Sequence, residues 1–279
     1  MKLVAPPRFA RPSSAHLNPL RRTFNGALVL GLLGLSLASP VSAQSPPATA
    51  RIAAAANLQP ALTELLALFH GATHSREPGL LVVNYGSSAN LMRQIQQGLP
   101  ADLFLSADED FALRLADTGW SADRGAVYAT GRLALLVPKE SKLVPDAQLA
   151  GLKEGVGSVT RFAIANPELA PYGRAAVQAL QKTGLWPQLQ AKLAIGENIA
   201  QTTQYVSSGA AEAGLTALPL ALTPEVAART RHAVVDAALH APLRQRMLLH
   251  KNAAPVARAF YEFLLSPAHR PVWQRHGYV

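Results

Sequence analysis

Short runs of apolar and β-branched residues alternate with amphipathic stretches from residue 51 to the end of the chain. After the first run, leucine and phenylalanine recur at helical spacing between Leu58 and Phe69. The pattern begins again after Arg132, as it would in a second lobe. This alternation is typical of α/β proteins, so we expect two lobes with mixed, mostly parallel sheets. The predicted strands are residues 51–55, 80–85, 102–105, 133–137, 161–165, 234–235 and 247–249.

Polar or aromatic residues stand where predicted strands lead into predicted helices, at Asn57, Ser88, Tyr172 and Asn198. Ligands of open α/β sheets bind beyond the carboxyl ends of the strands, where helix starts present unpaired N–H groups. Several converging helix starts would form an anion site in which N–H groups and hydroxyls replace arginine. The alternative for Asn57 and Ser88 is that each only caps its helix, for about 1 kcal/mol.

Residues 1–43 have the three parts of a secretory signal. Lys2 and four arginines precede an apolar run from Ala27 to Ala38, and Val41-Ser-Ala43 supplies a cleavage site. The apolar run is too short to span a bilayer, which favours cleavage over anchoring. We therefore expect a signal peptide over 1–43 and a periplasmic protein. Arg21-Arg22-Thr23-Phe24 resembles part of a twin-arginine export motif, and an ordinary basic segment is the alternative.

Charge and cysteine content exclude several classes of protein. The formal net charge is +9, but residues 1–43 hold five of the 26 basic residues and none of the 17 acidic ones. About +4 remains for the rest of the chain, which removes most of the case for nucleic-acid binding. The absence of cysteine excludes disulfides, thiolate catalysis and iron–sulfur clusters.

The sequence motifs of common enzyme classes are missing: there is no G-x-S-x-G, no Walker loop and no H-E-x-x-H. His70 and His74 have the spacing of metal ligands on one helix, but Gly71 lies between them and no third ligand is near. We interpret them as a helix end. We expect no catalytic residue and no cofactor, and the alternative is a secreted α/β enzyme whose nucleophile is unrecognised.

Three segments share features with one family. They are Ala53-Ala-Ala-Ala-Asn57-Leu58, Tyr85-Gly-Ser-Ser-Ala-Asn-Leu91 and Gly98-Leu-Pro-Ala-Asp-Leu-Phe-Leu-Ser-Ala-Asp108. Together they resemble the periplasmic molybdate-binding proteins of ABC importers, and the last segment is the most specific. The resemblance continues through Tyr172-Gly173, Glu197-Asn198-Ile199 and residues 260–264.

The resemblance implies a two-lobed type II periplasmic binding protein that holds molybdate or tungstate and delivers it to a membrane permease. Position by position, Asn57 and Ser88 would supply N–H and side-chain donors from the first lobe. Tyr172 and Ile199 would supply backbone N–H groups from the second lobe. Many relatives add a tyrosine hydroxyl at the position of Ala217, and this chain has no hydroxyl there.

The resemblance also sets the expected organisation of the chain. Lobe 1 comprises residues 48–130 plus 237–279, and lobe 2 comprises 131–236. The chain crosses between them near 128–132 and near 235–239, and two crossings permit hinge closure over a ligand. We expect a monomer.

The chemistry of the four residues agrees with this family. A fully deprotonated oxyanion only accepts hydrogen bonds, so N–H and O–H donors hold it without a counter-charge. Phosphate keeps a proton at neutral pH and would require a carboxylate acceptor, and none of the four residues is Asp or Glu. Glu197 lies two residues before Ile199, and we interpret it as a charge at a helix start. Sulfate or another oxyanion is the alternative ligand.

Overall fold

The structure is a computed structural model that describes residues 49–72 and 80–279. The predicted signal peptide over 1–43 and His74 lie outside the described residues. Within them, the strands form two five-stranded sheets, of order β2-β1-β3-β10-β4 and β7-β6-β8-β5-β9. The strands are β1 (Ala50–Ala55), β2 (Leu81–Gly86), β3 (Leu103–Leu105), β4 (Ala126–Gly131), β5 (Leu133–Pro138), β6 (Phe162–Ala165), β7 (Leu193–Gly196), β8 (Ala213–Ala217), β9 (Thr230–Val234) and β10 (Leu243–Leu249).

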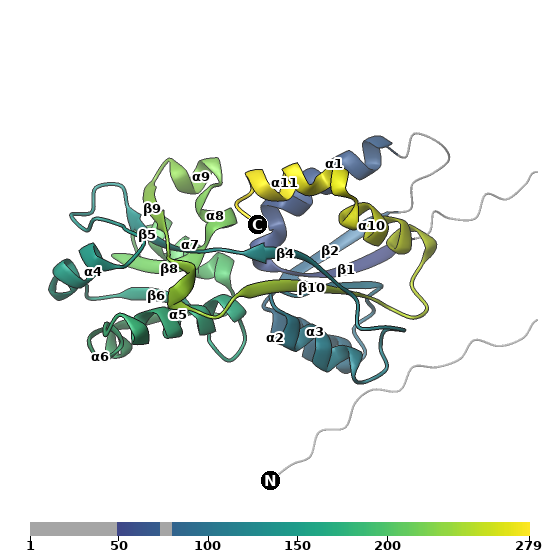
Figure 1. Cartoon of the computed structure of the whole chain (residues 1–279), viewed down its shortest axis with the longest axis horizontal. Helices are drawn as coiled ribbons and strands as arrows, with labels where there is room; N and C mark the ends of the chain where they lie inside the picture. Colours follow the sequence, from purple (N-terminus) through teal and green to yellow (C-terminus); the bar gives the residue numbers. More distant parts are fainter. Residues whose placement is uncertain (1–48, 73–79) are drawn as a thin grey trace, which may run out of the picture. The chain divides into compact units, whose positions relative to one another are not determined.

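Helices surround both sheets (Figure 1). The α-helices are α1 (Gln59–Ala72), α2 (Ser88–Gln96), α3 (Glu109–Ala116), α4 (Ala150–Gly155), α5 (Pro171–Lys182), α6 (Trp186–Leu189), α7 (Ile199–Ser207), α8 (Leu218–Ala221), α9 (Pro224–Ala227), α10 (Pro255–Leu265) and α11 (Arg270–Arg275). Short 3-10 turns are η1 (Ala56–Leu58), η2 (Val156–Ser158), η3 (Gln190–Lys192), η4 (Ala237–Leu239) and η5 (Pro267–His269).

Both sheets mix parallel and antiparallel pairs. In the first, β1 is parallel to β2 and β3, and β10 is antiparallel to β3 and β4. In the second, β6 is parallel to β7 and β8, and β5 is antiparallel to β8 and β9. The predicted α/β architecture with mixed sheets is confirmed, but the described sheets are not mostly parallel, because parallel and antiparallel pairs are equal in number.

Each sheet and its helices form one lobe. Lobe 1 contains the first sheet with α1, α2, α3, α10 and α11, and lobe 2 contains the second sheet with α4 to α9 (Figure 1). Arg132 alone separates β4 from β5, and η4 lies on the return from β9 to β10. The last helices come back to lobe 1, where α10 contacts β1 and α1. The described chain therefore passes between the two sheets twice, from β4 to β5 and from β9 to β10.

Apolar faces of the helices hold this arrangement together. In α1, Leu62 and Leu65 are fully buried, and the ring of Phe69 packs edge-on against Phe260 of α10 with ring centroids 5.1 Å apart. Burial of each such side chain contributes about 1.5–3 kcal/mol. The helical spacing between Leu58 and Phe69 thus packs on the sheet as predicted.

Several predicted boundaries differ from those in the structure. The strands β4, β7 and β8 and the helices α3, α4, α6, α8, α9 and α11 had no predicted counterpart, and β10 begins at Leu243. The predicted helix near Asn198 is confirmed: Asn198 caps α7, with its Oδ1 accepting from the N–H groups of Ala200 and Gln201 at 3.0 and 3.1 Å. Across 49–72 and 80–279, every helix is too short or too polar to cross a bilayer.

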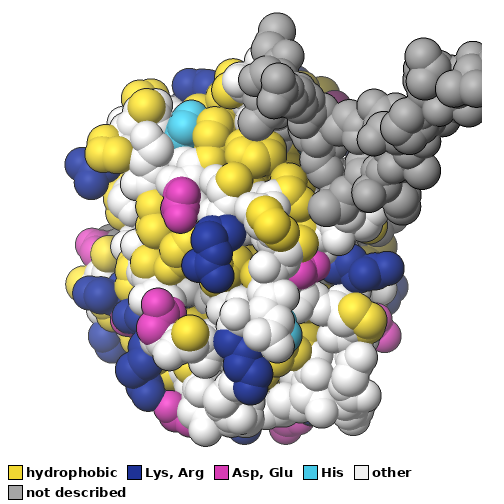
Figure 2. Space-filling model, turned by 90° about the vertical axis from the view of Figure 1, so that its right-hand side faces the viewer, with side chains coloured by type: hydrophobic (Ala, Val, Ile, Leu, Met, Phe, Trp, Pro, Cys, Tyr) yellow, Lys and Arg dark blue, Asp and Glu magenta, His cyan; other side chains and the backbone are white. Residues whose placement is uncertain are grey.

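The surface shows no gathering of one charge on the face that Figure 2 presents. Among the described residues there, Lys and Arg are interspersed with Asp, Glu and apolar side chains. Strong nucleic-acid binding requires a clustered basic face. This side of lobe 1 therefore has the mixed surface expected from a formal charge of about +4 outside the first 43 residues.

Candidate functional site

The four residues predicted to bind an anion are all buried. Asn57 is 0%, Ser88 1%, Tyr172 1% and Ile199 4% exposed. Each lies at the start of a helical turn: Asn57 in η1, Ser88 in α2, Tyr172 in α5 and Ile199 in α7. Asn57 and Ser88 come from lobe 1, and Tyr172 and Ile199 from lobe 2.

Contacts between these turns bring the four residues together. The turn η1 contacts α7, which joins Asn57 to Ile199. The N–H of Ala89 in α2 donates to the carbonyl of Leu169, just before α5, at 3.1 Å. The four residues therefore occupy one region where the lobes meet.

The backbone N–H groups of these residues are left without acceptors. Among the hydrogen bonds of the described residues, none has the N–H of Asn57, Ser88, Tyr172 or Ile199 as its donor. First-turn N–H groups have no partner within their own helix. Buried N–H groups are otherwise almost always paired in proteins. Four buried and unpaired donors in one region are what a small anion requires.

The hydroxyl of Ser88 adds a fifth donor. Its Oγ accepts from the N–H of Ala107 at 3.0 Å, which leaves its own hydrogen free to donate. Ser87, not Ser88, occupies the N-cap position of α2, with φ −77° and ψ 146°. The interpretation of Ser88 as a helix cap is therefore wrong. The Oγ of Ser87 is itself buried without a partner, and the sequence did not single it out.

Asn57 does not cap α1 either. Ala55 takes the N-cap position of η1, and the amide of Asn57 is drawn into a buried polar network. Its Nδ2 donates to Oε1 of Gln245 and to Oη of Tyr278, both at 3.0 Å, and Tyr278 Oη donates to the Asn57 carbonyl at 2.9 Å. The Oδ1 atom is buried and unpartnered. Both Nδ2 hydrogens are used within the network, so the donor that Asn57 offers to a ligand is its backbone N–H.

Tyr172 reaches from lobe 2 into the same network. Its Oη accepts from Nε2 of Gln245 at 3.2 Å. Burial raises the pKa of Tyr172 well above its ordinary value, so the phenol stays neutral. Gly131, at the end of β4, allows this approach, because a Cβ there would lie 2.2 Å from the Tyr172 Oη.

The position of Ala217 supplies no substitute hydroxyl. Ala217 is fully buried at the end of β8. The neighbouring Thr216 hydroxyl is already hydrogen-bonded to Thr203 of α7. The contact that many relatives make at this position thus has no counterpart on this strand.

The buried carboxylate of Asp108, next to Ala107, is already paired. Asp108 is 7% exposed, but Ser106, the Phe111 N–H and Arg174 all donate to its carboxylate. Burial raises the pKa of Asp108, and Arg174 opposes that change. Glu197 is exposed, as expected of a charge at a helix start. The carboxylate that protonated phosphate would need is therefore already occupied.

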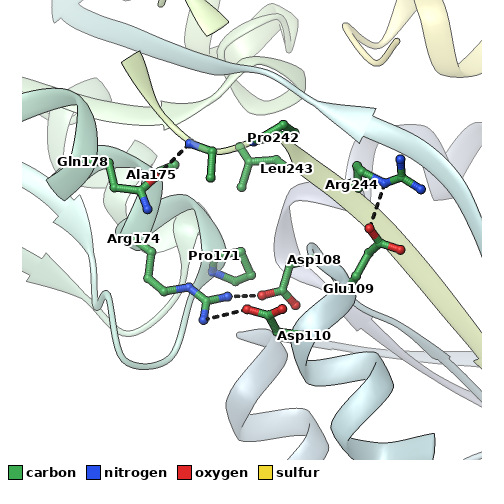
Figure 3. A pocket seen from close by; sticks show the side chains of 11 residues that line it. Asp108, Glu109, Asp110, Pro171, Arg174, Ala175, Gln178, Pro242, Leu243 and Arg244 are labelled. Carbon is green, nitrogen blue, oxygen red and sulfur yellow. Dashed lines mark hydrogen bonds and ion pairs between the residues drawn. The ribbon is translucent and has the colours of Figure 1, made fainter. Parts of the chain in front are cut away.

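A cavity of about 280 Å³ is lined by Asp108, Pro171 and Arg174 among others, but by none of the four predicted site residues (Figure 3). Arg174 crosses it from α5 to pair with Asp108, and lies 3.5 Å from Asp110 of α3. On the opposite wall, Arg244 of β10 pairs with Glu109 at 2.7 Å. Ion pairs thus join α5 of lobe 2 to α3 of lobe 1 next to the predicted site.

The sequence is similar to bacterial solute-binding proteins. Residues 50–279 match the family of bacterial extracellular solute-binding proteins. The chain is 32% identical to a molybdate-binding protein of Azotobacter vinelandii over 83% of this chain and 90% of that one. It is 31% identical to a molybdate-binding protein of Rhodobacter capsulatus over 91% and 95%.

Solved structures agree with these relatives. The periplasmic molybdate-binding protein of Azotobacter vinelandii superposes with a TM-score of 0.73 and 28% identity, over 82% of this chain and 98% of that one. A sulfate-binding protein of Mycobacterium tuberculosis superposes with a TM-score of 0.69 over 83% and 86%, but at 14% identity it shares the fold alone.

Proposed function

Because this chain belongs to the family of bacterial extracellular solute-binding proteins, we propose that it is the molybdate receptor of an ABC importer. The observation that carries the proposal is the set of unpaired N–H groups at Asn57, Ser88, Tyr172 and Ile199, all in buried residues. Two relatives more than 30% identical, of whose lengths the chain covers 90% and 95%, are named molybdate-binding proteins.

The chemistry of the donors supports a dianion without a proton. Neutral N–H and O–H donors in a site shielded from water hold such an ion, and charge assistance makes each of these hydrogen bonds stronger. Hydrogen phosphate also needs an acceptor, and the buried carboxylate nearby, Asp108, is already bound by Arg174 and Ser106. We propose tungstate as a second ligand, because it has the same charge and tetrahedral shape.

Residues from both lobes would contact the bound oxyanion, so binding would be coupled to closure of the lobes. Asn57 and Ser88 would bind from lobe 1, and Tyr172 and Ile199 from lobe 2, so a bound ion favours the closed arrangement. We propose lobe boundaries at 48–130 plus 237–279 and at 131–236. The closed protein would then be the form that the membrane permease recognises.

The remaining parts of the proposal concern location and assembly. We propose that residues 1–43 direct export to the periplasm, and that the protein acts there as a monomer without cofactor or catalysis. The family is one of bacterial extracellular solute-binding proteins, which supports export and solute binding.

Thermal unfolding of the purified protein tests the proposed ligand. A ligand that binds only the folded state adds about 4 kcal/mol at a thousandfold excess over its dissociation constant. We expect the melting temperature to rise with molybdate and with tungstate and to stay constant with phosphate. A rise with sulfate alone would assign the protein to sulfate, and no rise with any oxyanion would favour the secreted enzyme.

A further inference from the structure

Gln245 is a fully buried polar residue of lobe 1, on β10. Its side chain is 0% exposed and points inward from β10 between the buried residues Leu243 and Met247. It contacts three other polar side chains: Oε1 accepts from Asn57 at 3.0 Å and from Tyr128 at 3.1 Å, and Nε2 donates to Tyr172 at 3.2 Å.

An apolar side chain of similar length would fill this place but would leave the buried Asn57 Nδ2 and Tyr172 Oη without these hydrogen bonds. Burial of an amide is costly unless its hydrogen bonds are made, and here both ends of the Gln245 amide have partners. Those partners include two of the four residues proposed to bind the ligand. Gln245 therefore connects Asn57 of lobe 1 with Tyr172 of lobe 2 through a single side chain.

The connection lies on the two strands next to the crossings between the lobes. Gln245 pairs with Ala129 of β4, and Gly131 two residues further on makes room for the Tyr172 hydroxyl. Asn57, Tyr128 and Gln245 all belong to lobe 1. When the lobes separate, the bond from Gln245 to Tyr172 is the one in this network that must break.

We propose that Gln245 is a positioning residue for ligand binding. Its side chain fixes the Asn57 amide and, through the Tyr172 hydroxyl, the position of the first turn of α5. This inference rests on the proposed function. Through Tyr172, the Gln245 amide fixes the position of the Tyr172 backbone N–H, which the ligand would contact. Through Asn57, the same amide fixes the position of the turn η1, which contacts α7.

A double-mutant cycle on molybdate affinity tests this coupling by calorimetry on the purified protein. Gln245→Met removes both ends of the amide at nearly constant size, and Tyr172→Phe removes only the hydroxyl. We expect Gln245→Met to weaken molybdate binding about tenfold and Tyr172→Phe about threefold. The double variant should be no weaker than about tenfold, because both changes break the same connection.

A merely structural role gives a different result. The two losses would then multiply to about thirtyfold, which would overturn the inference. An unchanged affinity of Gln245→Met would overturn it as well. Tyr261→Phe, which removes a phenol of α10 outside this network, is the matched control and should bind like the wild type.

Gln245→Glu allows a second test, the pH dependence of molybdate affinity, which a change in packing alone would not alter. A protonated glutamic acid offers a carbonyl to Asn57 and an O–H to Tyr172, whereas the ionised form adds a charge beside the anion. The phenols of Tyr128, Tyr172 and Tyr278 face this position and stay neutral, because burial raises the pKa of each, and Asp108 is the carboxylate that acts on Tyr128.

We therefore expect the molybdate affinity of Gln245→Glu to approach that of the wild type near pH 6 and to fall toward about pH 9, the range in which buried carboxyl groups titrate. Wild-type affinity should stay level over that range. A level profile for Gln245→Glu would contradict the inference, even if Gln245→Met fails to fold. Absence of molybdate binding by the wild type would overturn the proposed function and this inference together, whereas wild-type binding with multiplying losses overturns the inference alone.

Discussion

The backbone N–H of Ala107 donates a hydrogen bond to the hydroxyl oxygen of Ser88 at 3.0 Å. Ala107 lies in the loop after β3, and Ser88 is the first residue of α2. The bond fixes the position of the Ser88 oxygen and leaves its hydrogen for a second partner. One residue thereby stabilises the loop and presents a donor toward the region where the lobes meet.

Replacing Ser88 by alanine should weaken molybdate binding more than it lowers stability. Loss of a hydrogen bond to a charged group costs about 1.5–3 kcal/mol, or about tenfold to more than a hundredfold in affinity. The unpaired Ala107 N–H should lower the free energy of unfolding by about 1–3 kcal/mol. Calorimetry measures the first effect, and chemical denaturation of the unliganded protein measures the second.

Alanine variants of two other serines serve as controls for Ser88→Ala. Ser121 is 7% exposed and donates to the Asp123 carbonyl at 2.6 Å, outside the candidate site, so Ser121→Ala should leave the affinity unchanged. Ser87→Ala should lose less affinity than Ser88→Ala, because Ser88 carries the contact that the family resemblance implies. Equal affinities for wild type and Ser88→Ala would reduce Ser88 to a structural residue.

Gly131→Ala should disturb the contact between the lobes. Its Cβ would lie 2.2 Å from Tyr172 Oη and 2.6 Å from Gln245 Nε2, so the phenol or the strand must move. Overpacking of this kind lowers the free energy of unfolding by about 1–3 kcal/mol. Gly157→Ala, where a Cβ meets nothing within 4 Å, is the control. Urea unfolding that fails to separate the two variants would contradict the contact.

Arg174→Met should loosen the closed arrangement. The guanidinium pairs with Asp108 and Asp110 across the lobes, but its side chain is 37% exposed, so solvent screens the interaction. We expect a loss of about two- to fivefold in molybdate affinity by calorimetry. Arg161→Met changes an exposed arginine of lobe 2 and should have no effect. A larger loss for Arg161→Met than for Arg174→Met would refute the role of this ion pair.

Glu109 should make stability depend on acid pH. Hydrogen bonds from Arg246, with a contribution from Arg244, lower the pKa of Glu109 below its ordinary value of 4.5. A lowered pKa in the folded state adds stability above the unfolded value, and this stability is lost as pH falls through the folded value. The difference in unfolding free energy between wild type and Glu109→Gln should be constant near neutral pH and should shrink below about pH 4.5. A difference that grows on acidification would contradict this assignment.

The sequence predicted the parts of the fold that follow from local patterns. Asn198 is a cap and α7 follows it, because its amide oxygen satisfies the free N–H groups of the first turn. Asn57 and Ser88 lie on the same edge of the first sheet because they follow the neighbouring parallel strands β1 and β2. Asn57 was misjudged as a cap, since its amide is engaged by Gln245 and Tyr278, 188 and 221 positions away.

Other parts depend on contacts that no local pattern reveals. The strand β4 ends in Gly131, and the close approach of Tyr172 and Gln245 explains the glycine. Gln245 could have been noticed as a polar residue at an inward position of β10, had that strand been predicted from Leu243 rather than from Met247. The pairing of Arg174 with Asp108 joins residues 66 positions apart and requires the two lobes to be in place.

Nuclear magnetic resonance of the backbone amides under titration with molybdate tests the central claim most directly. If the N–H groups of Asn57, Ser88, Tyr172 and Ile199 bind the oxyanion, their signals should shift most, saturate at one molybdate per chain, and stay in place with phosphate. Binding of molybdate that leaves these four signals unmoved would contradict the site, and a chain whose amide signals respond to no oxyanion would contradict the account as a whole.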